Sequence, residues 1–109
     1  MSEMITINDF NRLDIRIGKI ITAEQIPKSK KLIKITVDLG NERRTLVAGI
    51  AETYTPESLT GKLVPILTNL QPVTLMGVQS NGMILAADME SKAIVLTVDR
   101  EVTPGTKVR

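Results

Sequence analysis

A long stretch without a charged side chain, residues 63–87, constrains most strongly what this chain can fold into. A membrane-spanning helix needs about 20 mostly apolar residues, but prolines, glycines and side-chain amides interrupt this stretch throughout. We therefore expect a strand over residues 63–70, a turn-rich connection over 71–81 and a second strand over 82–87. Connections normally lie in water and carry function. One without charges is expected to pack down or to contact another molecule.

The chain contains no cysteine and no histidine, which narrows the chemistry it can perform. Disulfides, thiolate metal sites, cysteine nucleophiles and every serine–histidine arrangement are excluded. We expect a single domain over all 109 residues, without catalytic activity, metal or cofactor. The N-terminus has no charged segment followed by an apolar one, so we expect a cytoplasmic protein without a secretory signal or membrane anchor.

Alternating apolar residues predict an all-β fold. Thr6 is a suitable N-cap for a short helix over residues 7–12, and Thr55 with Pro56 predicts one helical turn between the third and fourth strands. Five strands with a helix at that place are the order of an OB-fold barrel, which we expect over about residues 13–87. A C-terminal strand extension over about residues 88–109 follows. The expected strands cover residues 13–24, 32–39, 44–50, 63–70, 82–87 and 93–98.

Positive charge gathers at one place in the first half of the chain, although the net charge is only +2. Four lysines lie in a predicted loop and at the start of the next strand, with no acidic residue between them: Lys28, Lys30, Lys31 and Lys34. Lysines in such a group contact nucleic-acid phosphates and make binding sensitive to salt. An ordinary solvated loop is the alternative explanation.

Several motifs stand in a specific order and spacing: Asp9-Phe10 followed by Leu13-Asp14-Ile15-Arg16-Ile17-Gly18-Lys19-Ile20, Lys31-Leu32-Ile33, Val37-Asp38-Leu39-Gly40 with Arg44-Thr45, Ala48-Gly49-Ile50-Ala51, and Asn69-Leu70 with Pro72, Leu75-Met76-Gly77, Ser80 and Gly82-Met83. Together, these motifs resemble the tRNA-binding domain family. The resemblance implies an OB barrel, which agrees with the strand order. Members occur as appended domains of methionyl-tRNA synthetases and as free-standing dimers. We expect the free-standing kind, with Ile94, Val95 and Leu96 of the C-terminal extension in the dimer interface.

The resemblance also implies RNA-binding positions beyond the lysines: Arg44 and three exposed positions, Asn69, Ser80 and Met83. Each has a structural alternative. Arg44 could pair with Glu42 or Asp38, Asn69 could cap the loop backbone, Ser80 could bond within a turn, and Met83 could be core.

The family's typical basic residues after the Asn-Leu-x-Pro turn are missing here, where Gln71, Val73 and Thr74 stand. The electrostatic contact is therefore expected to rest on the four lysines. The chain has only Phe10 and Tyr54 as aromatic residues, so base stacking on aromatic rings is not expected. This favours recognition of RNA shape and backbone.

The resemblance leaves two functions open. The first is a non-catalytic tRNA-binding protein, acting as a trans-acting cofactor or beta subunit of methionyl-tRNA synthetase. The second is a dimeric secretion chaperone that binds unfolded peptides, which an uncharged, methionine-containing loop would suit.

Overall fold

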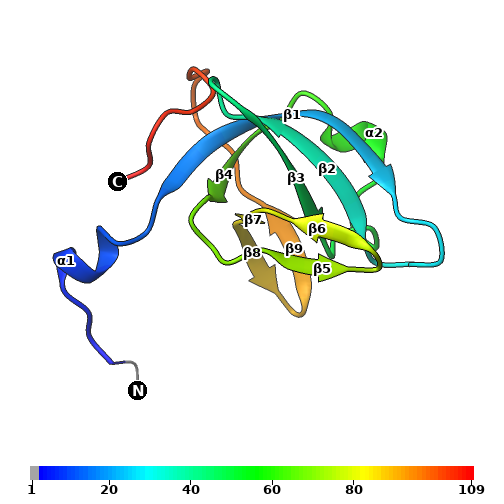
Figure 1. Cartoon of the computed structure of the whole chain (residues 1–109), viewed down its shortest axis with the longest axis horizontal. Coiled ribbons are helices and arrows are strands. Elements are labelled where there is room, and N and C mark those ends of the chain that lie inside the picture. Colours follow the sequence, from blue (N-terminus) through cyan, green and yellow to red (C-terminus); the bar gives the residue numbers. More distant parts are fainter. Residues whose placement is uncertain (1–2) are drawn as a thin grey trace.

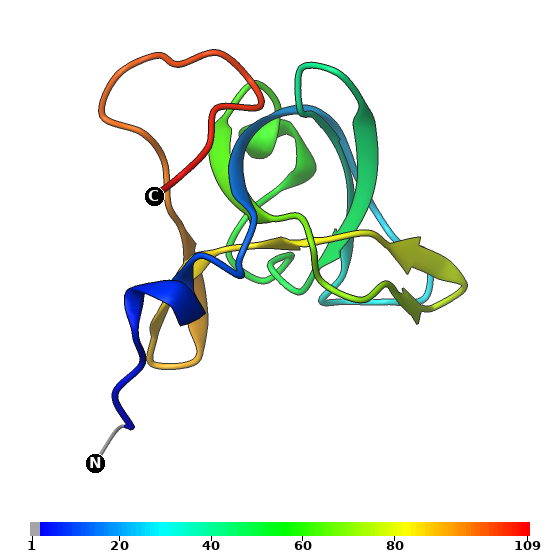
Figure 2. The same ribbon diagram turned by 60° about the vertical axis from the view of Figure 1, so that its left-hand side comes forward.

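The computed structural model describes residues 3–109, and its main feature is a five-stranded antiparallel sheet curled into a nearly closed barrel (Figures 1 and 2). The sheet strands are β1 (Ile15–Gln25), β2 (Ile33–Asp38), β3 (Arg43–Ala48), β4 (Leu63–Leu67) and β7 (Met83–Ile84). Their order is β3-β2-β1-β4-β7, and helix α2 (Pro56–Leu59) connects β3 to β4. Thr55 caps α2 by accepting the Ser58 N–H. This confirms the predicted OB-type barrel.

The long strand β1 bends so that it can pair with two neighbours. Residues 15–19 pair with β4 and residues 19–25 pair with β2. The register with β2 shifts between Ile20 and Thr22, where the sequence places two isoleucines in succession. Gly18 is buried at the bend, and a Cβ there would lie 2.5 Å from the Ile66 Cδ1. A side chain at this position of the barrel wall would force Ile66 and Leu39 to shift within the core.

The barrel interior is aliphatic, as the scarcity of aromatic residues requires. In β2, burial alternates strictly, with Ile33, Ile35 and Val37 inside while Lys34 and Thr36 are half-exposed. Alternate strand residues face opposite sides of the sheet, so one face of each strand supplies the core. The most deeply buried side chains are Ile20, Ile33, Ile35, Val37, Leu46, Leu59, Val64 and Ile66.

Residues 71–81 differ from the predicted irregular connection, because they contain a second, two-stranded sheet. Strands β5 (Val73–Leu75) and β6 (Val78–Ser80) form a tight hairpin across Met76 and Gly77. Both turn residues have positive φ angles, 50° and 81°, as in the type I′ turn that suits two-residue hairpins. The hairpin projects from the barrel beside the loop that follows β1 (Figures 1 and 2).

The predicted strand over residues 82–87 is also divided. Ile84 belongs to the barrel strand β7, whereas β8 (Ala86–Met89) turns away and pairs with β9 (Lys92–Val95). Gly82 lies in the turn before β7 and has a φ of 136°, which residues with a side chain rarely adopt. A Cβ at this position would also crowd Leu46 and Ile66. The sixth strand is therefore shorter than the predicted 93–98 and forms a small hairpin outside the barrel.

The two ends of the chain differ in how they contact the barrel. Helix α1 (Ile7–Phe10) has the predicted Thr6 cap but is shorter than predicted and buries none of its residues. The C-terminal segment instead returns to β1, where Gly105 donates its N–H to the Ile17 carbonyl and Val108 donates to Ile15. Part of the predicted extension thus completes the chain's own sheet edge. Within residues 3–109, no helix has the length and apolar composition needed to cross a membrane.

Candidate nucleic-acid interface

The loop between β1 and β2 holds the predicted lysines on an ordered backbone. Ile26 donates its N–H to the Leu32 carbonyl, and the Ser29 hydroxyl accepts the Leu32 N–H at 3.1 Å. Lys28 adopts a positive φ of 70° in the turn that Ser29 closes on Ile26. We call this segment, residues 26–32, the lysine loop. Its fixed backbone means that its charges are presented at a defined place.

The lysine side chains differ in their surroundings. Those of Lys28, Lys30 and Lys31 are exposed, and no carboxylate lies within 4.0 Å of their ammonium groups in the described part of the chain. Lys34 is half-exposed, and its Nζ lies 3.7 Å from Glu24 Oε1. The sequence did not reveal this partner, because Glu24 lies opposite Lys34 only through the pairing of β1 with β2. The three loop lysines are therefore available to meet an anion.

The β5–β6 hairpin lies against β3 and reaches the lysine loop. Ser80 donates its hydroxyl to the Gly82 carbonyl and accepts the Val47 N–H at 2.9 Å. Asn81 donates its N–H to the Thr45 carbonyl. These bonds fasten the base of the hairpin to β3, so that its tip extends over the barrel surface toward residues 24–27 (Figure 1).

A groove of about 440 Å³ separates the hairpin tip from the lysine loop. We call it the lysine–hairpin groove. Its apolar lining comes from both sides, with Ile26 and Pro27 on the loop and Met76 and Val78 on the hairpin. Glu24, Gln25 and Lys34 supply its polar groups. The uncharged stretch and the basic cluster, far apart in the sequence, therefore share one surface.

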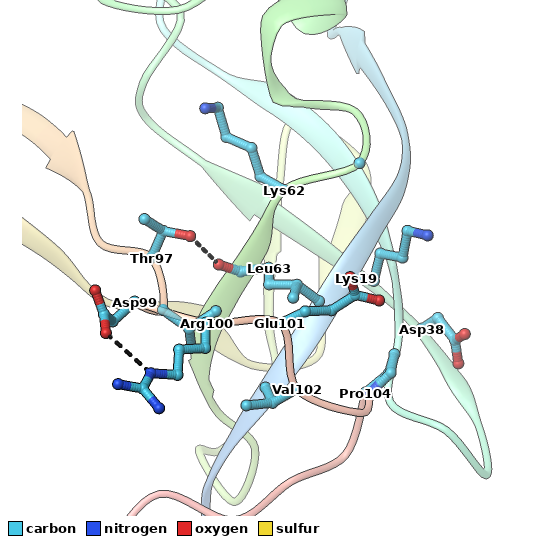
Figure 3. Close-up of a pocket in the computed structure, with 12 residues that line it drawn as sticks. Lys19, Asp38, Lys62, Leu63, Thr97, Asp99, Arg100, Glu101, Val102 and Pro104 are labelled. Carbon is cyan, nitrogen blue, oxygen red and sulfur yellow. Dashed lines mark hydrogen bonds and ion pairs between the residues drawn. The ribbon is translucent and has the colours of Figure 1, made fainter.

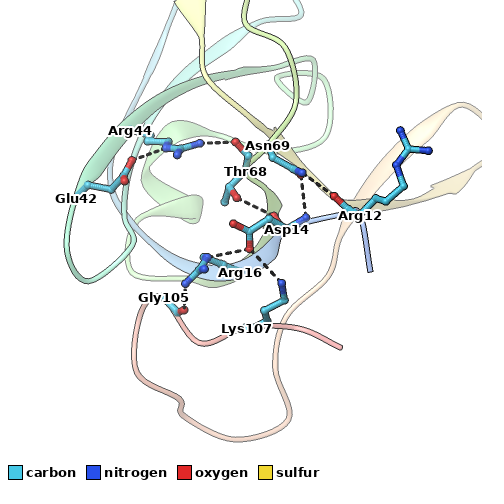
Figure 4. Close-up of polar contacts among 9 residues, drawn as sticks. All are labelled: Arg12, Asp14, Arg16, Glu42, Arg44, Thr68, Asn69, Gly105 and Lys107. Atoms are coloured by element: carbon cyan, nitrogen blue, oxygen red, sulfur yellow. Dashed lines mark hydrogen bonds and ion pairs between the residues drawn. The ribbon is translucent and has the colours of Figure 1, made fainter. Parts of the chain in front are cut away.

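Arg44 and Asn69 do not line the lysine–hairpin groove. They lie together in a polar network at the start of β3 and just beyond the end of β4 (Figure 4). The Arg44 guanidinium lies 2.5 Å from Glu42 Oε1 and donates to the Thr68 carbonyl. Asn69 accepts the Asp14 N–H at 2.8 Å through Oδ1 and donates to the Arg12 carbonyl at 2.7 Å through Nδ2. The Arg44 contact with Glu42 matches the structural alternative for that residue. Asn69 does not cap the backbone of the loop that follows it, because its side chain bonds the segment before β1 instead.

The carboxyl group of Asp14 has a lowered pKa in this network. Burial raises the pKa, but hydrogen bonds from Arg16 and Thr68 and the charges of Arg16 and Lys107 outweigh burial. The pKa therefore lies below its usual value of 3.8. The carboxylate stays ionised at neutral pH and links β1 to the C-terminal segment, with Lys107 Nζ at 3.6 Å.

The last two predicted RNA-binding residues have contrasting positions. Ser80 was expected to be exposed, but it is only 3% exposed and its hydroxyl is used within the chain. The expected exposure is wrong, because hydrogen bonds to the Val47 N–H and the Gly82 carbonyl hold the Ser80 side chain against β3. Met83 is 44% exposed on the edge strand β7, so it is not core.

The three residues expected in a dimer interface are not equally available. Val95 packs against the barrel core, and its N–H donates to the Tyr54 hydroxyl at 3.0 Å. Ile94 is half-buried, whereas Leu96 is 43% exposed. The most exposed apolar side chains lie instead in the segment that precedes β1 in the sequence, at Met4, Ile5 and Ile7.

A second cavity, of about 560 Å³, lies where residues 97–104 cross β1 and β4. Its positive side chains, Lys19, Lys62 and Arg100, are matched by equally many acidic ones. Figure 3 shows that these side chains diverge and that Arg100 turns toward Asp99. This cavity offers an anion no convergent set of donors, unlike the lysine loop.

Sequence reasoning missed Met76 and the hairpin that carries it. The signal was present, because Val73 and Leu75 alternate with Thr74 before a Met76-Gly77 turn. The interrupting glycine favoured a loop interpretation, and the hairpin is only three residues long on each side. Its position beside the lysines depends on bonds to β3 that local pattern does not encode.

Comparison with known proteins agrees with this architecture. Residues 15–107 match the family described as "Putative tRNA binding domain". The chain is 58% identical over 106 residues to methionine–tRNA ligase of Archaeoglobus fulgidus, covering 97% of this chain but only 16% of that protein. It therefore spans about one sixth of the length of this relative.

Two solved structures share the fold over their whole length. A methionyl-tRNA synthetase-related protein from Pyrococcus horikoshii superposes with a TM-score of 0.94 at 39% identity, covering 99% of this chain and 100% of that one. The chaperone CsaA of Bacillus anthracis superposes with a TM-score of 0.89 at 28% identity, covering 98% and 100%. The extent of these matches, together with the barrel that they share, shows that this chain belongs to the tRNA-binding domain family.

Proposed function

We propose that this protein is a non-catalytic tRNA-binding protein of the cytoplasm that recognises the shape and backbone of tRNA. The observation that carries the proposal is the lysine loop, where three exposed lysines without acidic partners among the described residues stand on an ordered backbone. Phosphate contacts of this kind supply most sequence-independent affinity for nucleic acid. Lys34 and the neighbouring hairpin extend the same surface.

The proposed role is that of a trans-acting cofactor or beta subunit of methionyl-tRNA synthetase. It is supported by 58% identity to part of a methionine–tRNA ligase and by 39% identity to a synthetase-related protein that the chain covers completely. Holding tRNA near a synthetase raises its effective concentration at the catalytic site. No catalytic group is required of this chain for that role.

A salt series with total tRNA tests the binding function. We expect affinity in the micromolar range and a steep, linear fall of log K with log salt concentration. The double variant Lys30→Ala/Lys31→Ala should reduce the steepness by about two, because each phosphate contact contributes about 0.9. Lys62→Ala/Lys92→Ala, which removes two exposed lysines outside the loop, is the matched control. Absence of wild-type binding would overturn the proposal.

Peptide binding is the second candidate function. Its supporting observations are the similarity to a chaperone at 28% identity and the exposed apolar side chains of the hairpin, Val73, Leu75 and Met76. Binding of an unfolded polypeptide that is insensitive to salt, with no binding of tRNA, would favour this function over the first.

We further propose that the protein acts as a homodimer. Met4, Ile5, Ile7 and Leu96 leave apolar surface exposed on a chain of this size, and such surface is typical of protein interfaces. In this dimer the interface lies nearer the N-terminal segment than residues 94–96, since Val95 packs within its own chain.

A further inference from the structure

We propose that the lysine–hairpin groove holds one unstacked nucleobase of the bound RNA, with Met76 as the apolar surface on which the base lies. This inference rests on the proposed tRNA-binding function and assigns a part of the RNA to a part of the protein. It adds to the phosphate contacts of the lysine loop a subsite that double-stranded RNA, with its bases stacked and paired, cannot fill.

The lining of the groove suits the apolar faces of a flat ring. Ile26 and Pro27 form one wall and Met76 and Val78 form the other, around a volume of about 440 Å³. Pockets for small ligands combine such apolar walls with a few placed polar groups. Here Gln25 supplies one, since its Nε2 donates to the Ser29 carbonyl at 3.1 Å. The Gln25 Oε1 can then accept from another donor, such as the amino group of a base.

The backbone at Met76 points to a role other than packing. Met76 has a φ of 50° at the first turn position, where glycine, asparagine and aspartate are favoured. It is also 55% exposed, so burial does not explain an apolar side chain there. Non-glycine residues held in the left-handed region cluster at ligand clamps and other functional sites.

The chemistry of methionine and lysine in one groove favours a nucleotide. The thioether side chain adapts to the face of an aromatic ring without being aromatic itself. Lys34 lies in the same groove, and its ammonium can approach the phosphate attached to that base, in exchange for its pairing with Glu24 at 3.7 Å. The adjacent Lys28, Lys30 and Lys31 favour a polyanion over a peptide.

Met76→Asn is the decisive variant, because asparagine suits the left-handed turn position and keeps the hairpin while removing the apolar surface. Met89→Asn is the control, since Met89 is 58% exposed on the other hairpin. Binding is measured over a salt series with two probes, total tRNA and a blunt-ended RNA duplex. A thermal melt of each variant verifies folding.

For Met76→Asn we expect a loss of tRNA affinity of about five- to tenfold at every salt concentration, consistent with the loss of one contact between a thioether side chain and an aromatic ring, and an unchanged salt dependence. Duplex affinity should stay within about twofold of wild type, and Met89→Asn should match wild type with both probes. Equal tRNA affinity of Met76→Asn and wild type would overturn the nucleobase subsite alone, as would an equal loss on the duplex.

Two further outcomes separate this inference from the proposed function. A wild-type protein that does not bind tRNA overturns both. The second outcome comes from a competition in which an unfolded polypeptide is added to the wild-type complex with tRNA and to the Met76→Asn complex. If the polypeptide weakens tRNA binding to wild type but leaves binding to Met76→Asn unchanged, the groove is a peptide site. That result overturns the nucleobase subsite and leaves the proposed tRNA binding intact.

Discussion

The side chain of Asn69 fastens the backbone of Asp14 to the end of β4. Asn69 Oδ1 accepts the Asp14 N–H at 2.8 Å, while its Nδ2 reaches back to the Arg12 carbonyl at 2.7 Å. Asp14 in turn accepts from the Thr68 N–H through its carbonyl. The chain leaving α1 is thereby tied to the barrel at the point where β1 begins (Figure 4).

Replacing Asn69 by alanine should therefore reduce stability. Two hydrogen bonds disappear, and the expected loss in the free energy of unfolding is about 1–2 kcal/mol. Urea denaturation measures it, with Asn8→Ala, an exposed asparagine of α1, as the control. A variant as stable as wild type but defective in tRNA binding would show instead that Asn69 contacts RNA.

The lowered pKa of Asp14 should make the folding stability of the protein fall at acid pH. Its pKa is lowered in the folded state, so its stabilising effect is fully present above the unfolded pKa of about 3.9 and is lost as pH falls through the folded value. Asp14→Asn should be less stable than wild type at pH 7, and the difference should shrink below about pH 4. Thermal melts between about pH 2 and pH 7 measure this, and Asp99→Asn controls for the loss of one exposed negative charge. A difference that stays constant with pH would contradict the assignment.

Replacing Lys28 by glycine should raise folding stability but weaken tRNA binding. Its φ of 70° is unfavourable for a residue with a side chain and accessible to glycine. Lys28→Gly should therefore raise the free energy of unfolding by about 0.5–1 kcal/mol, while the salt dependence of tRNA binding becomes less steep by about one. Lys28→Ala, which removes the charge but keeps the strain, separates the two effects. A less stable glycine variant would contradict the argument.

Replacing the exposed apolar residues near the N-terminus should convert the dimer to a monomer. Ile5 and Ile7 are 67% and 70% exposed, so Ile5→Ser/Ile7→Ser should not disturb the fold of the single chain. Sedimentation equilibrium should give wild type twice the 11.9 kDa chain mass and the variant the mass of one chain. Val98→Ser, a change outside the N-terminal segment, provides a comparison. A monomeric wild type would remove the basis for the dimer.

Much of the fold could be predicted from local pattern. Strict alternation in Ile33–Asp38 specified β2 and its buried face, and the successive Ile20 and Ile21 indicated the shift in β1. Thr55 and Pro56 placed α2 correctly. Each of these features depends on residues close in the sequence, where periodicity and capping act directly.

The site was less accessible to sequence reasoning. Lys28, Lys30 and Lys31 could be recognised as a cluster because they are neighbours in the chain. Their relation to Met76 could not, because it depends on the bonds of Ser80 and Asn81 to β3. The same holds for Glu24, which becomes the partner of Lys34 only when β1 pairs with β2.

The uncharged stretch at residues 63–87 separates what the sequence determines from what only the tertiary structure determines. The sequence by itself excluded a spanning helix there, placed one strand at its start and required an aliphatic barrel, because these follow from composition and short-range periodicity. Only the tertiary structure decided that its middle part is a hairpin laid against β3, that Ser80 is buried beneath it and that Met76 stands beside the lysine loop. Those relationships arise from hydrogen bonds between residues more than 30 positions apart, which no local pattern specifies.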